Sequence, residues 1–177
     1  MDQNFNNTFL KYVKPDNKIL DIGSGEGNFT QMFLERGAIV TTVDTKSSSL
    51  QDNTRLTIKE MKIEDFCATE VNTQYNLIFI RNIIQFLDKN WVLEIFFPWI
   101  SEHITNNGIV AIETFYKDPE PLFINLMQSL YSLKELNSYF MTWKEIYSKE
   151  YSHVSLDMDG KTRKFFTSSL IVQKTHN

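Results

Sequence analysis

The chain has 177 residues, which is the length of one domain, since most domains have about 100–200 residues. Hydrophobic residues make up 42% of the chain and charged residues 23%. This globular composition excludes a wholly disordered protein. The net charge of −4 and the pI near 5.4 argue against a nucleic-acid-binding protein with a strongly basic face.

Cysteine and histidine are too sparse to suggest a disulfide or a metal centre. The single cysteine, Cys67, excludes an internal disulfide and a multi-cysteine zinc site, and it favours a reducing, cytoplasmic compartment. The histidines at 103, 153 and 176 lack metal-site spacing, so we expect no metal. The first 14 residues do not resemble a signal peptide, and no apolar run reaches the length of about 20 residues that spans a bilayer. We therefore expect a cytoplasmic protein with no membrane partner.

Strand-like and helix-like segments alternate through the first two thirds of the chain. Apolar residues at near-helical spacing, from Phe5 to Val13, predict a short amphipathic helix before Pro15. The pattern then predicts strands at residues 18–22, 38–43, 55–58, 75–80 and 109–115, with helices at 29–36, around Leu50, at 83–87 and at 91–104, a kink at Pro98 and a turn at 106–108. This alternation is typical of a doubly wound α/β sheet.

The last third of the chain has a different pattern. Residues 122–139 are predicted to be helical, with Ser132 as an N-cap and Glu135 at the spacing of a capping box. Two strand-like runs, 143–155 and 163–172, are joined through Asp159-Gly160, which is a hairpin signal. We therefore expect the sheet to end in an antiparallel pair of strands.

Three of the six glycines fall within five residues, at the point where the first strand meets the next helix. Gly23, Gly25 and Gly27 allow the backbone to adopt positive φ and to approach a ligand closely. Ligands of open α/β sheets bind at this end of the strands. The alternative is a tight turn that holds no ligand. It is less favoured, because the spacings of Asp21 and Asp44 from the glycines are compatible with a ligand site.

Two ligand classes compete for this loop, a dinucleotide and S-adenosylmethionine. The dinucleotide pattern G-x-G-x-x-G would need a glycine where Asn28 stands. Asp21 and Glu26 would also repel a pyrophosphate. S-adenosylmethionine carries a sulfonium and an ammonium and has no phosphate, so nearby carboxylates favour it.

The stretch Ile19-Leu20-Asp21-Ile22-Gly23-Ser24-Gly25-Glu26-Gly27 resembles motif I of the class I S-adenosylmethionine-dependent methyltransferases. The resemblance implies a seven-stranded, mostly parallel Rossmann-like sheet with a C-terminal antiparallel hairpin. It implies that Asp44, 21 residues beyond Gly23, binds the ribose hydroxyls. The adenine partner is left open between Glu64 and Asp65, and the segment that starts at Arg81 is expected near the methionine end. The cofactor-binding residues implied in this way are Asp21, Gly23, Ser24, Gly25, Gly27, Asp44, Ile63, Glu64, Arg81 and Gln85.

The last third also resembles the small methyltransferases of the tellurite-resistance type, through residues 133–140 and Trp143-Lys144. That resemblance implies a tellurium or selenium oxyanion as acceptor, with His153 and Arg163 as catalytic residues. We expect a single domain with three parts: an N-terminal helix or lid at 1–14, a cofactor-binding half at 15–116, and substrate-side helices with the terminal hairpin at 117–177. Residues 113–121 are candidates to face the acceptor.

Each of these residues also has a purely structural interpretation. Asp44 could cap the next helix, and Arg81 could simply end a strand. His153 could be a packing residue, and Arg163 could lie in a solvated turn. Residues 95–100 are expected to be a helix packed on the sheet, with a dimer face as the alternative, so that a monomer and a homodimer both stay open.

We therefore predict a methyltransferase that acts on a small molecule such as a chalcogen oxyanion or a thiol, and not on nucleic acid. No [D/N/S]-P-P-[Y/F/W] signature of base-amine methylation follows the fourth strand. The alternatives are a non-catalytic regulatory module that binds S-adenosylmethionine and, less favoured, a dinucleotide-linked oxidoreductase.

Overall fold

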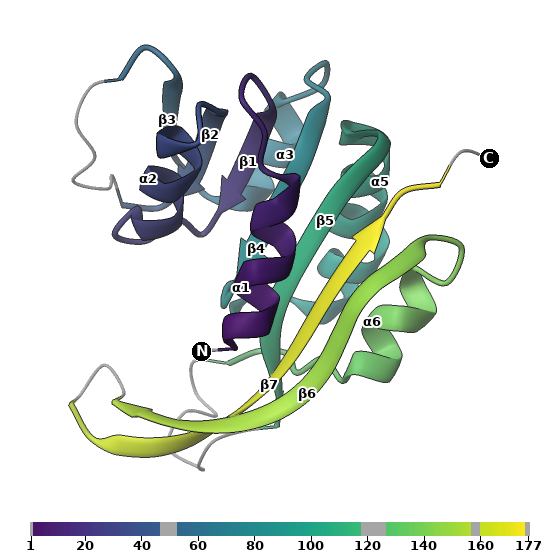
Figure 1. Ribbon diagram of the computed structural model, residues 1–177. Coiled ribbons are helices and arrows are strands. Elements are labelled where there is room, and N and C mark those ends of the chain that lie inside the picture. The colour runs from purple at the N-terminus through teal and green to yellow at the C-terminus, as the bar shows by residue number, and fades with distance from the viewer. Residues whose placement is uncertain (1, 47–52, 118–126, 157–159, 176–177) are drawn as a thin grey trace.

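The computed structural model describes residues 2–46, 53–117, 127–156 and 160–175, and its centre is a seven-stranded sheet with the order β3-β2-β1-β4-β5-β7-β6 (Figure 1). Strands β1 to β5 pair in parallel, and β7 runs antiparallel to both of its neighbours. The predicted fold class is therefore confirmed. The strands are β1 (Lys18–Ile22), β2 (Ile39–Asp44), β3 (Leu56–Glu60), β4 (Tyr75–Arg81), β5 (Ile104–Lys117), β6 (Lys144–Leu156) and β7 (Thr162–Gln173).

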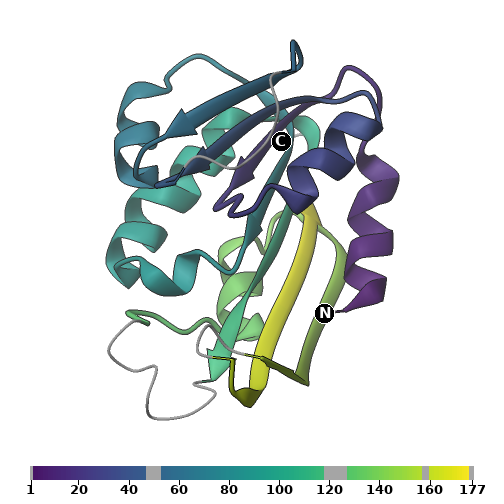
Figure 2. The same cartoon turned by 90° about the vertical axis from the view of Figure 1, so that its left-hand side faces the viewer.

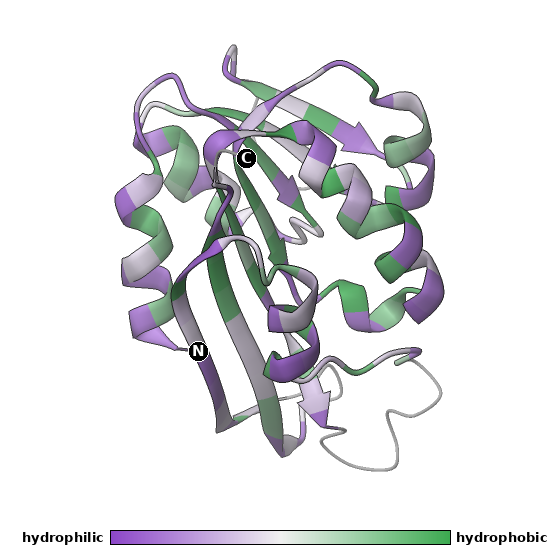
Figure 3. Ribbon diagram, turned by 90° about the vertical axis from the view of Figure 1, so that its right-hand side faces the viewer, coloured by the Kyte–Doolittle hydropathy of each residue, from purple (hydrophilic) through white to green (hydrophobic). Residues whose placement is uncertain are grey.

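Helices cover both faces of the sheet (Figure 2). One face packs against α1 (Gln3–Phe9) and α2 (Asn28–Glu35), and the other against α3 (Ile63–Thr69), α5 (Phe97–His103) and α6 (Leu133–Tyr139). Shorter turns are η1 (Leu10–Tyr12), η2 (Ile84–Phe86), α4 (Lys89–Trp91) and the π-helical turn η3 (Val92–Phe96). The central strands are hydrophobic while the helices carry hydrophilic outer faces (Figure 3), as parallel strands buried on both sides require. None of the helices in the described ranges has both the length and the apolar character of a membrane span.

A cluster of phenylalanine rings fixes α1 and α2 to the sheet. Phe79 on β4 lies 4.8 Å from Phe9 and from Phe29, 5.6 Å from Phe33 and 6.4 Å from Phe5, measured between ring centroids. Phe5 and Phe9 are completely buried. The structure has the predicted N-terminal helix, and its buried rings make it part of the core.

Polar contacts hold the start of α1 against β6. Asp2 accepts a hydrogen bond from the Asn4 amide at 2.9 Å and caps the helix. Its carboxylate also accepts the Tyr147 hydroxyl and lies 3.0 Å from Lys149 Nζ. Burial opposes ionisation of Asp2, but these hydrogen bonds outweigh it and hold the pKa below its ordinary value. The N-terminal helix is thus tied to the C-terminal hairpin.

The predicted turn at residues 106–108 is wrong, because β5 runs through these residues. Tyr75 pairs with Ile104 and Leu77 with Ile109, so the extra residues of β5 bulge out of the sheet. Backbone bonds between this bulge and Lys174, at 3.1 and 3.0 Å, keep the segment in the strand. The turn-forming residues therefore produce a bulge rather than a break.

The helices differ from the sequence prediction in their boundaries. Ser132 accepts the Glu135 amide and Glu135 accepts the Ser132 amide, so the predicted capping box is confirmed. This capping box starts α6 at Leu133, and residues 127–132 are not helical, so the predicted helix over 122–139 is too long. Residues 122–126, the expected helix around Leu50 and most of the hairpin turn lie outside the described residues.

The predicted helix over 91–104 is divided into α4, η3 and α5 and ends at His103. Pro98 lies in the first turn of α5, directly after the π-helical turn η3 and within a continuous helical run, where it lacks the N–H that a regular helix would use. The irregularity expected at Pro98 takes the form of the π-helical turn just before it.

We predict that Phe79→Ala lowers the free energy of unfolding by about 3–5 kcal/mol, because it removes the ring at the centre of the phenylalanine cluster. Val71→Ala is the control: Val71 is 67% exposed, and its truncation should change stability by less than about 0.5 kcal/mol. Denaturant unfolding of both variants measures the difference, and similar losses would contradict the assignment of the core.

Candidate functional site

The glycine loop turns sharply between β1 and α2. Gly23 has a φ of +71°, and its amide donates to the Val43 carbonyl at 2.8 Å. A Cβ at this position would lie 2.9 Å from Ile83 Cβ, which is too close for any real contact. Gly27, with a φ of +79°, is the N-cap residue of α2. The loop thus needs glycine at Gly23 for two reasons, its positive φ and its contact with Ile83.

Asp44 connects the end of β2 to the glycine loop. Its carboxylate accepts the Gly25 amide at 2.9 Å through Oδ2 and the Lys46 amide at 3.1 Å through Oδ1. Each carboxylate oxygen can accept a further hydrogen bond. Asp44 also lines a pocket beside the loop, so its carboxylate both supports the loop and faces a potential ligand. The helix it was suggested to cap lies outside the described residues.

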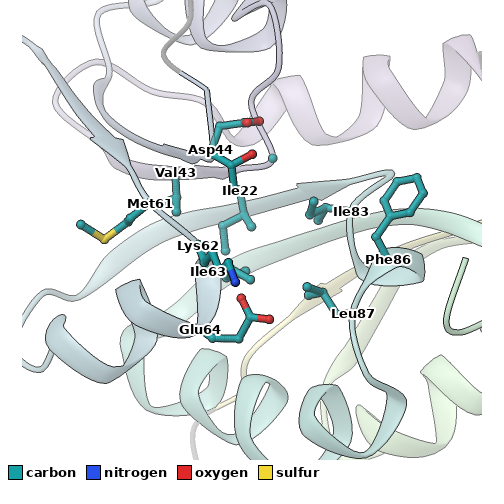
Figure 4. A pocket seen from close by; sticks show the side chains of 12 residues that line it. Ile22, Val43, Asp44, Met61, Lys62, Ile63, Glu64, Ile83, Phe86 and Leu87 are labelled. Carbon is teal, nitrogen blue, oxygen red and sulfur yellow. The ribbon is translucent and has the colours of Figure 1, made fainter. Parts of the chain in front are cut away.

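An apolar pocket of about 250 Å³ lies on the α3 side of the loop (Figure 4). Its walls are mostly hydrophobic side chains from β1, β2, the start of α3 and the segment after β4, while Asp44, Lys62 and Glu64 supply its polar groups. Glu64 lines this pocket, and Asp65 does not. Of the two acids that the sequence left open, the geometry therefore favours Glu64. The hydrophobic lining residues are Ile22, Val43, Met61, Ile63, Ile83, Phe86 and Leu87.

A second, polar pocket of about 450 Å³ lies on the α1 and α2 side of the loop. Gly23 lines both pockets, so they meet at the sharp turn. Asp21, Arg81 and Asn82 bring a carboxylate, a guanidinium and an amide into the polar pocket. Its other lining residues are Asn6, Ser24, Gly25, Glu26, Asn28, Phe29, Met32 and Phe79.

Asp21 is a buried carboxylate, 2% exposed. Thr30 Oγ1 donates to its Oδ2 at 2.5 Å. Burial is the main effect on its ionisation, and with the nearby charge of Asp44 it raises the pKa of Asp21 to about 6, against the opposing effects of Thr30 and Arg81. Ionisation of Asp21 therefore lowers the free energy of unfolding, and it places a negative charge in the wall of the polar pocket.

Arg81 ends β4 and is held by Glu113 of β5. Its Nε lies 2.8 Å from Glu113 Oε1, and its guanidinium carbon lies 5.0 Å from the centre of the Phe29 ring. Since Arg81 lines the polar pocket, the interpretation as an ordinary strand-end residue does not account for its position. Gln85 differs from the other predicted cofactor residues: its side chain is fully buried, accepts Thr114 Oγ1 at 3.1 Å and lines neither pocket.

His153 lies on β6 and Arg163 on β7, both near the turn of the C-terminal hairpin. His153 pairs with Phe165 across the hairpin, and its ring lies 5.6 Å from those of Tyr151 and Phe165. Burial lowers the pKa of His153, and its Nδ1 has no hydrogen-bond partner within the described residues. Arg163 is only 5% exposed, so the alternative of a solvated turn is wrong. Neither residue lines the two pockets.

Sequence reasoning missed several residues that line the pockets, chiefly Ile83, Phe86 and Asn82. The first two follow β4 in a segment whose apolar residues did suggest helix packing. Asn82 belongs to the segment that was expected near the methionine end, but the sequence gave it no role of its own. The structure gives it a φ of +51°, which is uncommon for a residue other than glycine. No group of three or more His, Cys, Asp or Glu in the described ranges is arranged to hold a metal ion.

We predict that Gly23→Ala destabilises the fold by about 2–4 kcal/mol, because the added methyl group combines a strained φ with overpacking against Ile83. Gly160→Ala is a matched control, since Gly160 has a similar φ of +74° and open space around it. It should lose only the conformational part, about 1–2 kcal/mol. Equal losses in denaturant unfolding would show that the contact with Ile83 has no effect.

We predict that Asp21→Asn becomes more stable than the unchanged protein as the pH rises. The raised pKa of Asp21, about 6 against an ordinary 3.8, means that the folded chain holds this proton more tightly than the unfolded chain. The contribution is therefore fully present below pH 4 and is lost as the pH rises through about 6. The difference in unfolding free energy between variant and unchanged protein should grow by about 2–3 kcal/mol between pH 4 and pH 7. A difference that is independent of pH would contradict the burial of this charge.

Comparison with proteins of known structure gives the same fold. TehB from Haemophilus influenzae matches with a TM-score of 0.78 at 19% identity, over 99% of this chain and 63% of TehB. The Burkholderia thailandensis 1,6-didemethyltoxoflavin-N1-methyltransferase, crystallised with 1,6-didemethyltoxoflavin and S-adenosylhomocysteine, matches with a TM-score of 0.73 at 15% identity, over 97% and 76% of the two chains. A SAM-dependent methyltransferase from Methanosarcina mazei has a TM-score of 0.70 at 13% identity, over 96% and 97%. The chain therefore spans somewhat less than two thirds of TehB.

The family assignment comes from the sequence itself. No curated protein matches the chain, but the model of the FtsJ-like methyltransferases matches residues 1–138. The predicted S-adenosylmethionine cofactor agrees with this family and with the structural relatives. Because the match covers well over half of its length, the chain belongs to the FtsJ-like methyltransferase family.

Proposed function

We propose that the chain transfers a methyl group from S-adenosylmethionine to a small-molecule acceptor, a chalcogen oxyanion of the tellurite or selenite type or a thiol. The observation that carries the proposal is the pair of pockets that meet at Gly23, one apolar and one with buried charges. A ligand that fills both would be largely apolar at one end and carry polar or charged groups at the other.

The residues present fit this cofactor. The apolar pocket would take the adenine ring, and the carboxylate of Asp44 at its edge would accept the ribose hydroxyls. The polar pocket would take the amino-acid end, with Asp21 and Arg81 as groups of opposite charge. Asp21 and Glu26 would repel the pyrophosphate of a dinucleotide, which disfavours the oxidoreductase alternative.

The chemistry of methyl transfer asks little of the protein beyond positioning. When bound, S-adenosylmethionine supplies a methyl group that its cationic sulfonium already activates. The chain has to hold the acceptor in line with that methyl group and exclude water, which can account for about 7–11 kcal/mol of the barrier when the geometry is ideal. The buried carboxylate of Asp21 and the guanidinium of Arg81, which Glu113 holds, would fix the amino-acid end of the cofactor and so the position of its methyl group.

The acceptor is proposed to lie toward the C-terminal hairpin. His153, Phe165 and Arg163 share one side of the hairpin, beyond the last pairing of β7 with β5, and this is the side of the sheet that carries Arg81. Arg163 is always charged and suits an oxyanion. The lowered pKa of His153 keeps its imidazole neutral near pH 7, so His153 suits the removal of a proton from a thiol better than the binding of an anion. The resemblance of the last third to the tellurite-resistance type supports the oxyanion.

One observation favours the alternative of a non-catalytic module that binds S-adenosylmethionine. Neither His153 nor Arg163 lines the pockets, so an acceptor must reach the methyl group by other contacts. Turnover distinguishes the two functions, because only the enzyme releases S-adenosylhomocysteine.

We predict that the purified chain releases S-adenosylhomocysteine from S-adenosylmethionine with at least one acceptor of a panel of tellurite, selenite and small thiols. Asp44→Ala should weaken binding of S-adenosylhomocysteine about 10- to 100-fold, because it removes charged acceptors of the ribose hydroxyls. Asp65→Ala is the matched control, since Asp65 is exposed and lines neither pocket. Calorimetry measures both affinities.

Each other outcome assigns a different function. Tight binding of S-adenosylhomocysteine without product from any acceptor would favour the regulatory module. Competition by NAD in a thermal-shift assay would favour the oxidoreductase. Equal effects of the Asp44 and Asp65 variants would contradict the ribose assignment.

A further inference from the structure

We propose that Glu113 is a positioning residue that aims Arg81 at the α-carboxylate of the cofactor and so makes the site selective for a nucleoside that carries an amino acid. The inference rests on the proposed function. It concerns a residue on β5 that lines neither pocket and acts through its neighbour.

Glu113 is held from three directions. It is 2% exposed, and its Oε2 accepts the Tyr151 hydroxyl at 2.9 Å and Ser169 Oγ at 3.1 Å, while Oε1 accepts Arg81 Nε at 2.8 Å. Tyr151 and Ser169 belong to β6 and β7, so both strands of the C-terminal hairpin fix this carboxylate. A carboxylate held in this way is a rigid support for a guanidinium.

The pairing leaves the rest of the Arg81 guanidinium available. Only Nε bonds to Glu113, and the two terminal nitrogens have no hydrogen-bond partner in the part of the chain that the structure describes. The side chain is 23% exposed, lines the polar pocket and lies over the Phe29 ring. The two terminal nitrogens can together bind a carboxylate through two parallel hydrogen bonds.

Glu113 also positions the next residue of the pocket. Its carbonyl accepts the Asn82 amide at 2.8 Å, which helps to hold Asn82 at its positive φ. Asn82 lines the polar pocket, and its Oδ1 is buried without a hydrogen-bond partner among the described residues. A buried acceptor in this state is costly unless a ligand donates to it. Arg81 as a donor, together with Asp21 and Asn82 as acceptors, forms a site for a group that carries both an ammonium and a carboxylate.

Without Glu113, Arg81 would be left in a pocket that holds a second carboxylate, Asp21. The two residues line the same pocket, and their charges already interact. An ion pair between them would occupy both the donor and the acceptor that the amino-acid end requires. Glu113 therefore prevents a competing contact as well as providing a favourable one.

The test compares two ligands that differ only beyond the sulfur, S-adenosylhomocysteine and 5′-methylthioadenosine, which lacks the amino acid. Glu113→Gln should weaken S-adenosylhomocysteine about tenfold, the loss of roughly one charge-assisted hydrogen bond. It should leave 5′-methylthioadenosine within about twofold of the unchanged protein. Arg81→Met should show the same selective loss, and the double variant should bind no more weakly than Arg81→Met alone, because Glu113 acts through Arg81. Glu145→Gln removes an exposed charge from the same hairpin and should change neither affinity.

The outcomes separate this inference from the proposed function. Equal weakening of both ligands by Glu113→Gln would mean a purely structural role and overturn the inference, as would no weakening, or losses that add in the double variant. In each of those cases the unchanged protein still binds S-adenosylhomocysteine, and the proposed function stands. If the unchanged protein binds neither nucleoside, the proposed function fails, and the inference fails with it.

Discussion

The close contact between Gly23 and Ile83 is the constraint on which the rest of the site depends. At this point the turn after β1 meets the segment after β4, with space for a glycine and for no larger residue. The Gly23 amide is bonded to β2 through Val43, and the Asp44 carboxylate holds the next part of the loop through Gly25. Three strand ends are thereby fixed relative to one another, and the two pockets open on either side of the contact. A looser turn would merge or close these pockets.

The same edge of the sheet contains a buried carboxylate, Asp21, and a strained residue, Asn82, and both lower the stability of the fold. Asp21 is fully enclosed, and its pKa of about 6 means that its ionised form is held at a cost in free energy. Asn82 adds a left-handed φ and a buried acceptor with no partner within the described residues. Such strain persists only where packing over-determines the structure, and here the phenylalanine cluster around Phe79 lies directly behind the polar pocket. The hydrophobic core thus offsets the unfavourable terms of the site beside it.

The sequence was informative where the signal is local. The strands β1 to β4 and the second half of β5 were predicted from apolar and β-branched segments, and the glycine loop and the capping box at Ser132 from residue type and spacing. The errors have tertiary causes. Residues 106–108 have the composition of a turn, but bonds to Lys174 hold them in β5. Gln85 lies in the segment expected near the methionine end, and its buried side chain accepts a hydrogen bond from Thr114 of β5, a contact that the sequence could not indicate. The position of Glu113 could not be predicted, because its partners come from three strands that are distant in sequence.

The antiparallel hairpin gives this fold a connection that a wholly parallel sheet would lack. Because β7 lies between β5 and β6, residues near the hairpin tip, where His153 and Arg163 lie, share their strands with Tyr151 and Ser169, which hold Glu113. A shift of the hairpin would therefore also move the support of Arg81. The N-terminal helix restricts such a shift, since Asp2 ties α1 to Tyr147 and Lys149 on β6. The C-terminal hairpin, Glu113 and Arg81 at the end of β4 are thus linked by side-chain hydrogen bonds, and the N-terminal helix is joined to the same hairpin through Asp2.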